Sequence, residues 1–381
     1  MYIGRPADHI SWRTLRRSYQ WPFITYEKNY ILQVETIQHY FFDWTIVETT
    51  YGVAFLEYEN TSLPVDKSKL NFLPTDCSPE KKCTVLNCPF ERYPSDYNYK
   101  CLSYDKLKHP HPENIDKEIL QDTQFTEGYE EHFINMHYDS HVDGFKFEFP
   151  TGMPYYNEDK MNLISKDCTS VNCPRNADKY DRNCNCFYHK KHKLGNIIQI
   201  VLYNMGTGGA FSTGYAHPFH IHGTHYYVMK VGWPSYNASG MIENLNPDIA
   251  CAGPHADCDG ASWANKTWLN GAVSGMNTKN PSSRDTITLP VGGYIVIRYK
   301  FFLKFRYHIW FTYLYTNFCR FRAKNPGWFF AHCHLVLHHM GGTAYAFKVG
   351  EDSEIPMPPD NFPHDCGYFS MPSVSHVYNR N

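Results

Sequence analysis

The chain has 381 residues, enough for two or three domains, and its hydrophobic share of 42% can supply a sizeable core. With 36 basic and 38 acidic residues the net charge is -2, which excludes a polycationic nucleic-acid-binding protein. A charged share of only 19% excludes an intrinsically disordered chain. Aromatic residues reach 17%, with 24 glycines and 24 prolines, which is typical of many short strands and turns. We therefore expect an all-β protein.

Three regions follow one another along the chain. Residues 1–62 alternate aromatic and polar positions, as partly buried strands do, and are predicted to be the end of a β domain. Residues 63–140 are polar and rich in proline and cysteine, which indicates a connector held by disulfides. From residue 141 to 381, short strand patterns recur between turns, at 144–150, 196–204, 225–232, 285–290, 294–299 and 343–350. This last region is predicted to be a separate β domain.

The cysteines indicate the compartment. Most of the 13 fall into clusters, namely Cys77, Cys83, Cys88 and Cys101, then Cys168, Cys173, Cys184 and Cys186, then Cys251 and Cys258. This density favours disulfides in an oxidising compartment, although the spacing leaves the pairings open. Asn60, Asn237 and Asn265 lie in glycosylation triplets. We expect a secreted, extracellular glycoprotein without a membrane span whose signal peptide is missing from this sequence.

Two histidine clusters carry the chemistry. The first is His217-Pro218-Phe219-His220-Ile221-His222-Gly223, and the second is His332-Cys333-His334 followed by His338 and His339. Residues i and i+2 of a strand share a face, so His332 and His334 point one way and Cys333 the other. Cys333 and His338 with His217 make a His₂Cys set, the ligand combination of blue-copper sites. The other imidazoles, of His220, His222, His332 and His334, offer a surface for further copper.

Two other interpretations of these residues are a zinc site and a set of buried structural histidines. Zinc prefers a closed tetrahedral set such as Cys₂His₂, and buried histidines can be purely structural. Here a single cysteine is accompanied by six histidines at strand periodicity, which favours copper. A third His-x-His triplet, His109-Pro110-His111, lies in the polar connector without other ligand types nearby and is interpreted as a surface pair.

The motifs resemble the C-terminal copper-binding domain of the multicopper oxidases, the laccase-like group. The HPxHxHG pattern is matched from His217 to Gly223, and HCHxxxHxxxGM by the second cluster up to Gly342. Asn280 to Thr286, Pro290 to Gly293 and the Asn-Pro-Gly-Trp turn at 325–328 match three further runs. The resemblance covers residues 141–381 well and 1–62 loosely. It implies a cupredoxin-like Greek-key β-sandwich or barrel, preceded by the remnant of a second such domain.

The resemblance also implies roles for the histidines. His217, Cys333 and His338 would bind the type 1 copper that takes electrons from the reducing substrate. His220 would be a type 2 ligand, and His222, His332 and His334 would be type 3 ligands where O₂ is reduced. The axial position, ten residues after Cys333, is Thr343 and not Met, which predicts a weak axial bond and a relatively high potential. Met340 is expected to serve packing, and His339 to face away from the metals as an exposed residue.

The implied activity is one-electron oxidation of phenols, aromatic amines or a metal ion, with O₂ as the acceptor. The family completes its three-copper cluster with two more pairs, HWHG and HSH, which do not occur in this sequence. The chain thus resembles an N-terminally truncated member whose type 2 and type 3 sites are half-liganded. The alternative is a non-catalytic or electron-transfer blue-copper protein that has lost the trinuclear centre. The substrate and the oligomeric state do not follow from the motifs.

One segment departs from the family pattern. Between Arg298 and Arg320, residues 299–319 include ten aromatic residues but no glycine or proline, unlike a solvated loop. Codons for Phe, Tyr, Leu, Lys and Asn, which occur in this segment, are AT-rich, and Phe318-Cys319-Arg320 can be encoded by a sequence like a splice acceptor. Deleting 22 residues restores IVIRFRAKNPGW. A translated, unspliced intron is therefore favoured over a lineage-specific hairpin extension, and Cys319 would then be a stray thiol.

Overall fold

A computed structural model describes residues 8–13, 30–39, 46–56, 77–93, 98–121, 128–137, 140–151, 165–169, 171–174, 184–205, 216–252, 258–270, 272–300 and 326–356. For the first three of these ranges it describes the backbone alone. Two parts of the chain with predictions lie outside the described residues. They are Asn60 and residues 301–325, which include Cys319, most of the predicted insertion and its C-terminal flank.

Strands dominate the described residues. In chain order they are β1 (Asp8–Arg13), β2 (Tyr30–His39), β3 (Ile46–Leu56), β4 (Cys83–Leu86), β5 (Tyr99–Leu102), β6 (Tyr129–His137), β7 (His141–Val142), β8 (Lys146–Phe147), β9 (Asn185–Cys186), β10 (His189–His192), β11 (Ile197–Asn204), β12 (His217–Ile221), β13 (Tyr226–Gly232), β14 (Ser235–Tyr236), β15 (Ile242–Asn244), β16 (Ile249–Ala252), β17 (Gly260–Trp263), β18 (Ser283–Arg284), β19 (Thr286–Leu289), β20 (Gly293–Lys300), β21 (Gly327–Cys333) and β22 (Ala344–Val349). The helical elements are α2 (Val336–Met340) and the 3₁₀ turns η3 (Tyr104–Lys106), η4 (Pro112–Asn114), η6 (Lys266–Asn270) and η7 (Asp352–Glu354). The all-β class predicted from composition is confirmed.

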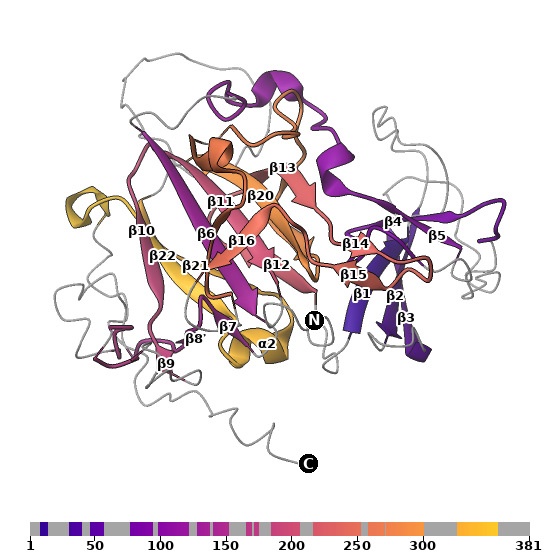
Figure 1. The fold of residues 1–381 in the computed structure, drawn as a ribbon, viewed down its shortest axis with the longest axis horizontal. Helices are drawn as coiled ribbons and strands as arrows, with labels where there is room; N and C mark the ends of the chain where they lie inside the picture. Colours follow the sequence, from indigo (N-terminus) through magenta and orange to yellow (C-terminus); the bar gives the residue numbers. More distant parts are fainter. Residues whose placement is uncertain are drawn as a thin grey trace, which may run out of the picture.

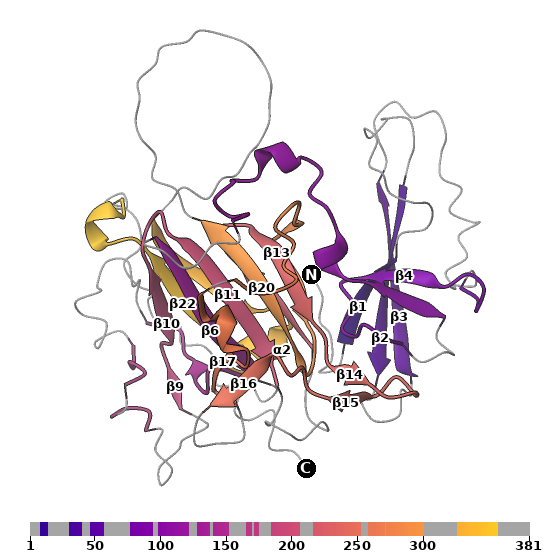
Figure 2. The same ribbon diagram turned by 45° about the horizontal axis from the view of Figure 1, so that its top comes forward.

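Two sheets form a sandwich (Figures 1 and 2). One has the strand order β10-β22-β21-β12-β19, and the other β18-β13-β20-β11-β6-β7. Pairing within them is antiparallel except that β10 runs parallel to β22 and β6 runs parallel to β11. The strands predicted at 196–204, 225–232, 285–290, 294–299 and 343–350 are confirmed as β11, β13, β19, β20 and β22.

The central strands β11 and β20 are buried on both faces. Ile198 and Ile200 of β11 belong to the core between the two sheets, together with Phe219 and Phe347. The alternate residues of β11 pack on the other side, where Trp263 and the strands β16 and β17 cover the sheet. A strand covered on both faces reads as a continuous apolar run, which explains the sequence IIQIVLYN.

A smaller sheet lies beside the sandwich, to its right in Figures 1 and 2. Its order is β3-β2-β1-β4-β5, so strands from the predicted remnant and from the predicted connector join one sheet. Strand β6 also comes from the predicted connector, yet it pairs with β11 of the sandwich over seven residue positions. The domain boundaries at residues 62 and 140 stay predictions. The pairings add that the smaller sheet and the sandwich each include strands from the predicted connector.

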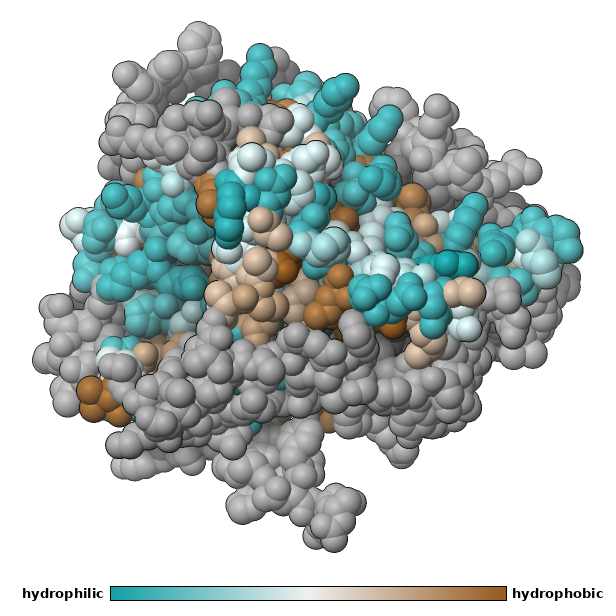
Figure 3. Space-filling model, viewed as in Figure 1, coloured by the Kyte–Doolittle hydropathy of each residue, from teal (hydrophilic) through white to brown (hydrophobic). Residues whose placement is uncertain are grey.

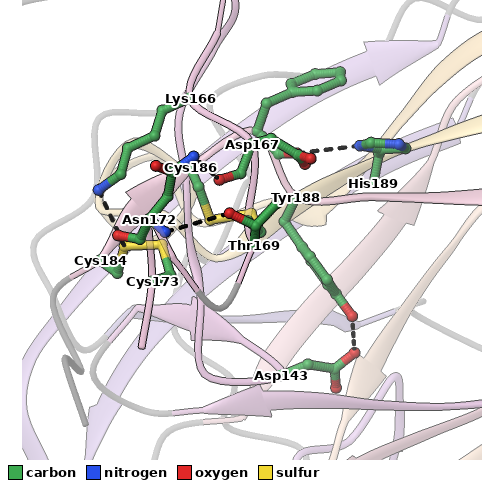
Figure 4. Close-up of a disulfide and its surroundings, with 12 residues drawn as sticks. Asp143, Lys166, Asp167, Thr169, Asn172, Cys173, Cys184, Cys186, Tyr188 and His189 are labelled. Atoms are coloured by element: carbon green, nitrogen blue, oxygen red, sulfur yellow. Dashed lines mark hydrogen bonds between the residues drawn. A yellow bond between two sulfur atoms is a disulfide. The ribbon is translucent and has the colours of Figure 1, made fainter. Parts of the chain in front are cut away.

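Five disulfides join cysteines within the clusters seen in the sequence. They are Cys77–Cys83, Cys88–Cys101, Cys168–Cys186, Cys173–Cys184 and Cys251–Cys258. Figure 4 shows the pair Cys173–Cys184 with its surroundings, where the ammonium of Lys166 donates to Cys184 Sγ at 3.2 Å. Among the described cysteines, Cys333 alone is a free thiol, and it is buried.

The described surface carries few large apolar side chains. Those exposed are Phe149, Val171, Leu269 and Val336. The face in Figure 3 is mostly hydrophilic over its described residues, with hydrophobic residues gathered near the centre. Within the described ranges, no helix has the length and apolar character needed to cross a membrane.

Candidate metal centre

The two histidine clusters meet because β12 and β21 are neighbouring antiparallel strands. Phe219 lies opposite Cys333, and His220 lies opposite His332. Alternation then separates the side chains: Cys333 faces the core, where it is fully buried, while His332 faces the other side with His220. The opposed orientation predicted for Cys333 and its neighbours agrees with this register.

Inside the sandwich, the sulfur of Cys333 meets the imidazoles of His217 and His338, and from here on we call this spatial group the first cluster. Cys333 Sγ lies 3.6 Å from His338 Nδ1, which lies 3.3 Å from His217 Nδ1. His217 is fully buried and His338 nearly so. Ligands bound at about 2.0 to 2.3 Å to a shared first-row metal ion lie about 3.3 to 3.7 Å apart, so the three donor atoms fit around one ion. A soft thiolate with two imidazoles is the donor set that copper electron-transfer sites use.

Helix α2 turns the chain so that His338 comes back over Cys333. The amide of Thr343 donates to the carbonyl of His338 at 3.0 Å, and the amide of Cys333 donates to the carbonyl of Thr343 at 3.0 Å. Gly342 sits in this turn at φ +117°, where a Cβ atom would lie 2.8 Å from the carbonyl oxygen of Ser140. Only glycine fits there without moving the backbone, which explains the glycine four residues after His338.

Burial sets the protonation states of this cluster. It raises the pKa of the Cys333 thiol to about 12, so the thiol keeps its proton at neutral pH when no metal is bound. It lowers the pKa of His338 to about 4, with His339 adding to the effect, so this imidazole is neutral and already has a lone pair for a metal. A metal must therefore displace one proton, that of Cys333.

Copper uptake by the reduced, metal-free chain is accordingly expected to depend on pH. Because binding releases the Cys333 proton, the apparent affinity for Cu⁺ should rise about tenfold per pH unit between roughly pH 7 and pH 9. Competition with a chelator of known affinity, corrected for the chelator's own protonation, measures the slope. A flat profile would contradict the thiolate as a ligand.

The imidazoles of His220, His222, His332 and His334 gather on the opposite face of β21, and from here on we call this spatial group the second cluster. His222 Nε2 and His332 Nε2 are 3.3 Å apart. The ring of His334 lies 5.4 Å from that of His220 and 5.6 Å from that of His332. His220, His222 and His332 offer nitrogen atoms that all lie within 4.8 Å of one another. Burial lowers the pKa of His332 to about 3, which keeps this ring neutral.

Backbone groups orient two of these rings. His220 Nδ1 lies 3.0 Å from the carbonyl oxygen of Asp285 and 2.9 Å from Thr286 Oγ1. His332 Nδ1 lies 2.8 Å from the carbonyl oxygen of Cys333. An Nδ1 proton donated to a carbonyl leaves the Nε2 lone pair for a metal, as metal-binding histidines commonly arrange it. The orienting role of the Asp285 carbonyl and Thr286 is visible only in the structure, although both residues belong to the run that matched the family.

Three other predicted positions can be located. His339 is half-buried, its ring lies 4.9 Å from that of His332, and its Nδ1 is 3.2 Å from the carbonyl oxygen of Cys333. The expectation that His339 is exposed and faces away is therefore wrong, because the short helix α2 folds it against β21. Thr343 is fully buried, and its Oγ1 has no hydrogen-bond partner among the described residues. Within the predicted surface pair, the backbone amide of His111 donates a hydrogen bond to Nδ1 of His109 at 3.0 Å.

A family model described as multicopper oxidase matches residues 152–312 and 316–353, which is more than half of the chain and includes both histidine clusters. The chain belongs to the multicopper oxidase family. Its described β-sandwich agrees with the cupredoxin-like fold class predicted from the motifs.

Similar proteins include laccases and iron multicopper oxidases. Laccase-7 of Oryza sativa subsp. japonica is 29% identical over 178 residues, covering 46% of this chain and 22% of the relative. The iron multicopper oxidase fer1 of Mycosarcoma maydis is 22% identical over 291 residues, covering 76% of this chain and 35% of the relative. The crystal structure of a laccase from Botrytis aclada aligns with a TM-score of 0.33 at 14% identity, over 62% of this chain and 30% of that one. This multicopper oxidase chain thus spans between about a fifth and a third of these relatives' lengths.

Proposed function

We propose that this multicopper oxidase chain takes single electrons from a small reducing molecule at a type 1 copper held by His217, Cys333 and His338. The reductant belongs to the class of phenols, aromatic amines or metal ions, and O₂ is the final acceptor. Copper supplies the one-electron redox couple at this site. The observation that carries the proposal is the buried cluster of one sulfur and two imidazole nitrogens with separations of 3.6 and 3.3 Å.

The same strand links the two clusters covalently. Cys333 is bonded through the backbone to His332 and His334, whose rings belong to the second cluster. Electrons accepted at the sulfur therefore have a short through-bond route to the opposite face of β21. We infer that His220 serves a type 2 copper and that His222, His332 and His334 serve the type 3 pair, where O₂ is reduced to water.

This chain offers four imidazoles to the trinuclear site, whereas the family resemblance implies eight. The missing four would come from HWHG and HSH pairs supplied by another segment. His222 and His334 are exposed among the described residues, so the second cluster is accessible to such a segment.

Two steps of the reaction can be tested separately. The chain, loaded with cuprous salt and aerated, should turn blue, and one equivalent of a phenol should bleach one type 1 copper. Rapid recovery of the colour with O₂ uptake is expected only when a segment carrying the two extra His-x-His pairs is supplied. A chain that stays colourless contradicts the proposal. A chain that is blue and is never reoxidised rapidly, even with that segment, would instead be an electron-transfer protein.

The compartment is also a proposal. Five disulfides among the described cysteines suit an oxidising environment. Asn237 and Asn265 both lie in exposed turns, where an oligosaccharide could be attached without disturbing the core. We infer that the protein is a secreted glycoprotein.

A further inference from the structure

A group of three side chains that could bind a metal ion lies at the opposite end of the sandwich from the proposed copper ligands. Glu130, His132 and His192 offer donor atoms that all lie within 4.8 Å of one another. His192 pairs with Val349, at the far end of β22 from Ala344, which pairs with His332. Five residues of strand separate these positions, which corresponds to about 17 Å. None of the three residues contributes to the copper clusters.

The three side chains come together because two edge strands face each other. Glu130 and His132 alternate with Ile134 along β6 and so share its inner face. His192 comes from β10, the edge strand of the opposite sheet. Among the described strands, β11 alone pairs with β6 near Glu130, because the pairing of β6 with β7 involves Met136 and His137. The group therefore bridges the two sheets at an edge of the sandwich.

The carboxylate of Glu130 is held in one orientation. Its Oε1 accepts a hydrogen bond from the amide of Lys193 at 3.0 Å and from Asn196 Nδ2 at 2.8 Å. Its Oε2 is left facing both imidazoles, at 3.0 Å from His132 Nε2 and 3.0 Å from His192 Nδ1. Fixing one carboxylate oxygen by outer hydrogen bonds so that the other meets the metal is how proteins pre-orient metal ligands.

The protonation states suit a cation. Burial alone would raise the pKa of Glu130, but the hydrogen bonds from His132, His192, Lys193 and Asn196 outweigh it, so the pKa is well below its usual value and the carboxylate is ionised. Burial lowers the pKa of His192 and keeps its ring neutral. Two imidazoles and one carboxylate are a donor set that zinc accepts in sites with an open fourth position.

Access to the group is one-sided. The side chain of His192 is 0% exposed, whereas those of Glu130 and His132 are 18% and 25% exposed. An ion could therefore enter from the His132 side and keep a water molecule as its fourth ligand. We propose that Glu130, His132 and His192 form an accessory zinc site that ties the two sheets together at this edge. The proposal goes beyond the copper chemistry and does not rest on it.

Zinc binding by the full chain tests the proposal. Equilibrium dialysis against Zn²⁺, followed by metal analysis, is compared for the wild-type chain, His132→Gln, Glu130→Gln and the matched control His189→Gln. His189 lies on β10 with His192 but outside the group. We expect the wild-type chain and the control to bind one more zinc ion than the other two variants, because each of these lacks one of the three protein ligands.

Thermal unfolding provides a second readout. Zinc should raise the unfolding midpoint of the wild-type chain and of His189→Gln, because a ligand bound only by the folded state stabilises it, and should raise it less in His132→Gln. If Glu130→Gln unfolds because it loses its hydrogen bonds, His132→Gln carries the comparison, since the His132 side chain is partly exposed. Equal zinc stoichiometry and equal midpoint shifts in all chains would overturn the proposal and leave the group as a polar bridge. Occupancy by Cu²⁺ but not by Zn²⁺ would overturn the zinc assignment.

Discussion

Replacing Cys333 by serine is expected to abolish the blue absorption of the copper-loaded chain, because that colour requires a copper–thiolate bond. Serine preserves the approximate size of the side chain and the hydrogen bond from the amide of residue 333 to Thr343. Its hydroxyl, however, is a hard and weakly acidic ligand. Absorption spectra of the two chains after loading with cuprous salt and aeration measure the effect.

The imidazole cluster supplies an internal control for this substitution. His220, His222 and His332 lie on the opposite face of β21 and make no use of the sulfur. Copper bound by the second cluster should therefore persist, and Cys333→Ser should lose one copper ion per chain and no more. Loss of all copper would show that the substitution damaged the fold.

Met340→Leu is the matched control for Cys333→Ser. Met340 lies in α2, two residues after His338, and its predicted role is packing only. Its replacement by an apolar residue of similar volume should leave the blue absorption in place. Absorption that survives in Cys333→Ser, or that disappears in Met340→Leu, would contradict the assignment of the sulfur ligand.

Removal of residues 299–320 is expected to give a more stable and less aggregation-prone chain. In the described structure β20 ends with Tyr299, which is buried, and Lys300, which pairs with Asp116 and Glu118. After the deletion, Phe321 and Arg322 follow Arg298 directly. Phe321 then takes the position of Tyr299 and Arg322 that of Lys300, so the alternation of β20 is preserved.

The expected gain comes from the connection between β20 and β21. Shortening it from 26 residues to four lowers the entropic cost of closing the loop by roughly 1.5 kcal/mol. It also removes ten aromatic residues from a segment that lacks the composition of a loop. Thermal unfolding should show a midpoint a few degrees higher, and light scattering should show less aggregation on heating.

A deletion that is one residue shorter provides the control. Removing residues 299–319 places Arg320 in the position of the buried Tyr299 and shifts the following residues to the other face of the strand. This variant should be strongly destabilised, because an unpaired guanidinium would enter the core. If both deletions destabilise the chain equally, the segment is an integral extension and the retained-intron hypothesis is wrong. A cDNA that encodes the segment in most transcripts would count against it as well.

The proposed copper ligands could be recognised as candidates from the sequence because their chemistry and their strand period are local properties. Alternation at 332–334 already separates Cys333 from His332 and His334, and the five motifs in their order pointed to the family. The strands β11, β13, β19, β20 and β22 were recognisable for the same reason, since each carries its own apolar pattern between turns.

Contacts between distant segments were not readable in this way. His192 lies 62 residues from Glu130 in the chain, and no motif joins them, so their meeting depends on two edge strands facing each other. The half-buried position of His339 depends on how α2 folds back onto β21. The disulfide partners likewise became clear only in the structure, because several pairings fit the same spacing.

The sequence by itself determined the candidate metal ligands, the all-β class and the resemblance to the multicopper oxidases, since these depend on residue identity and on the two-residue period of a strand. The tertiary structure decided which carbonyls orient His220 and His332, and it brought together Glu130, His132 and His192. These arrangements arise when separate strands are packed into one sandwich, and the interactions across that packing have no fixed distance along the chain.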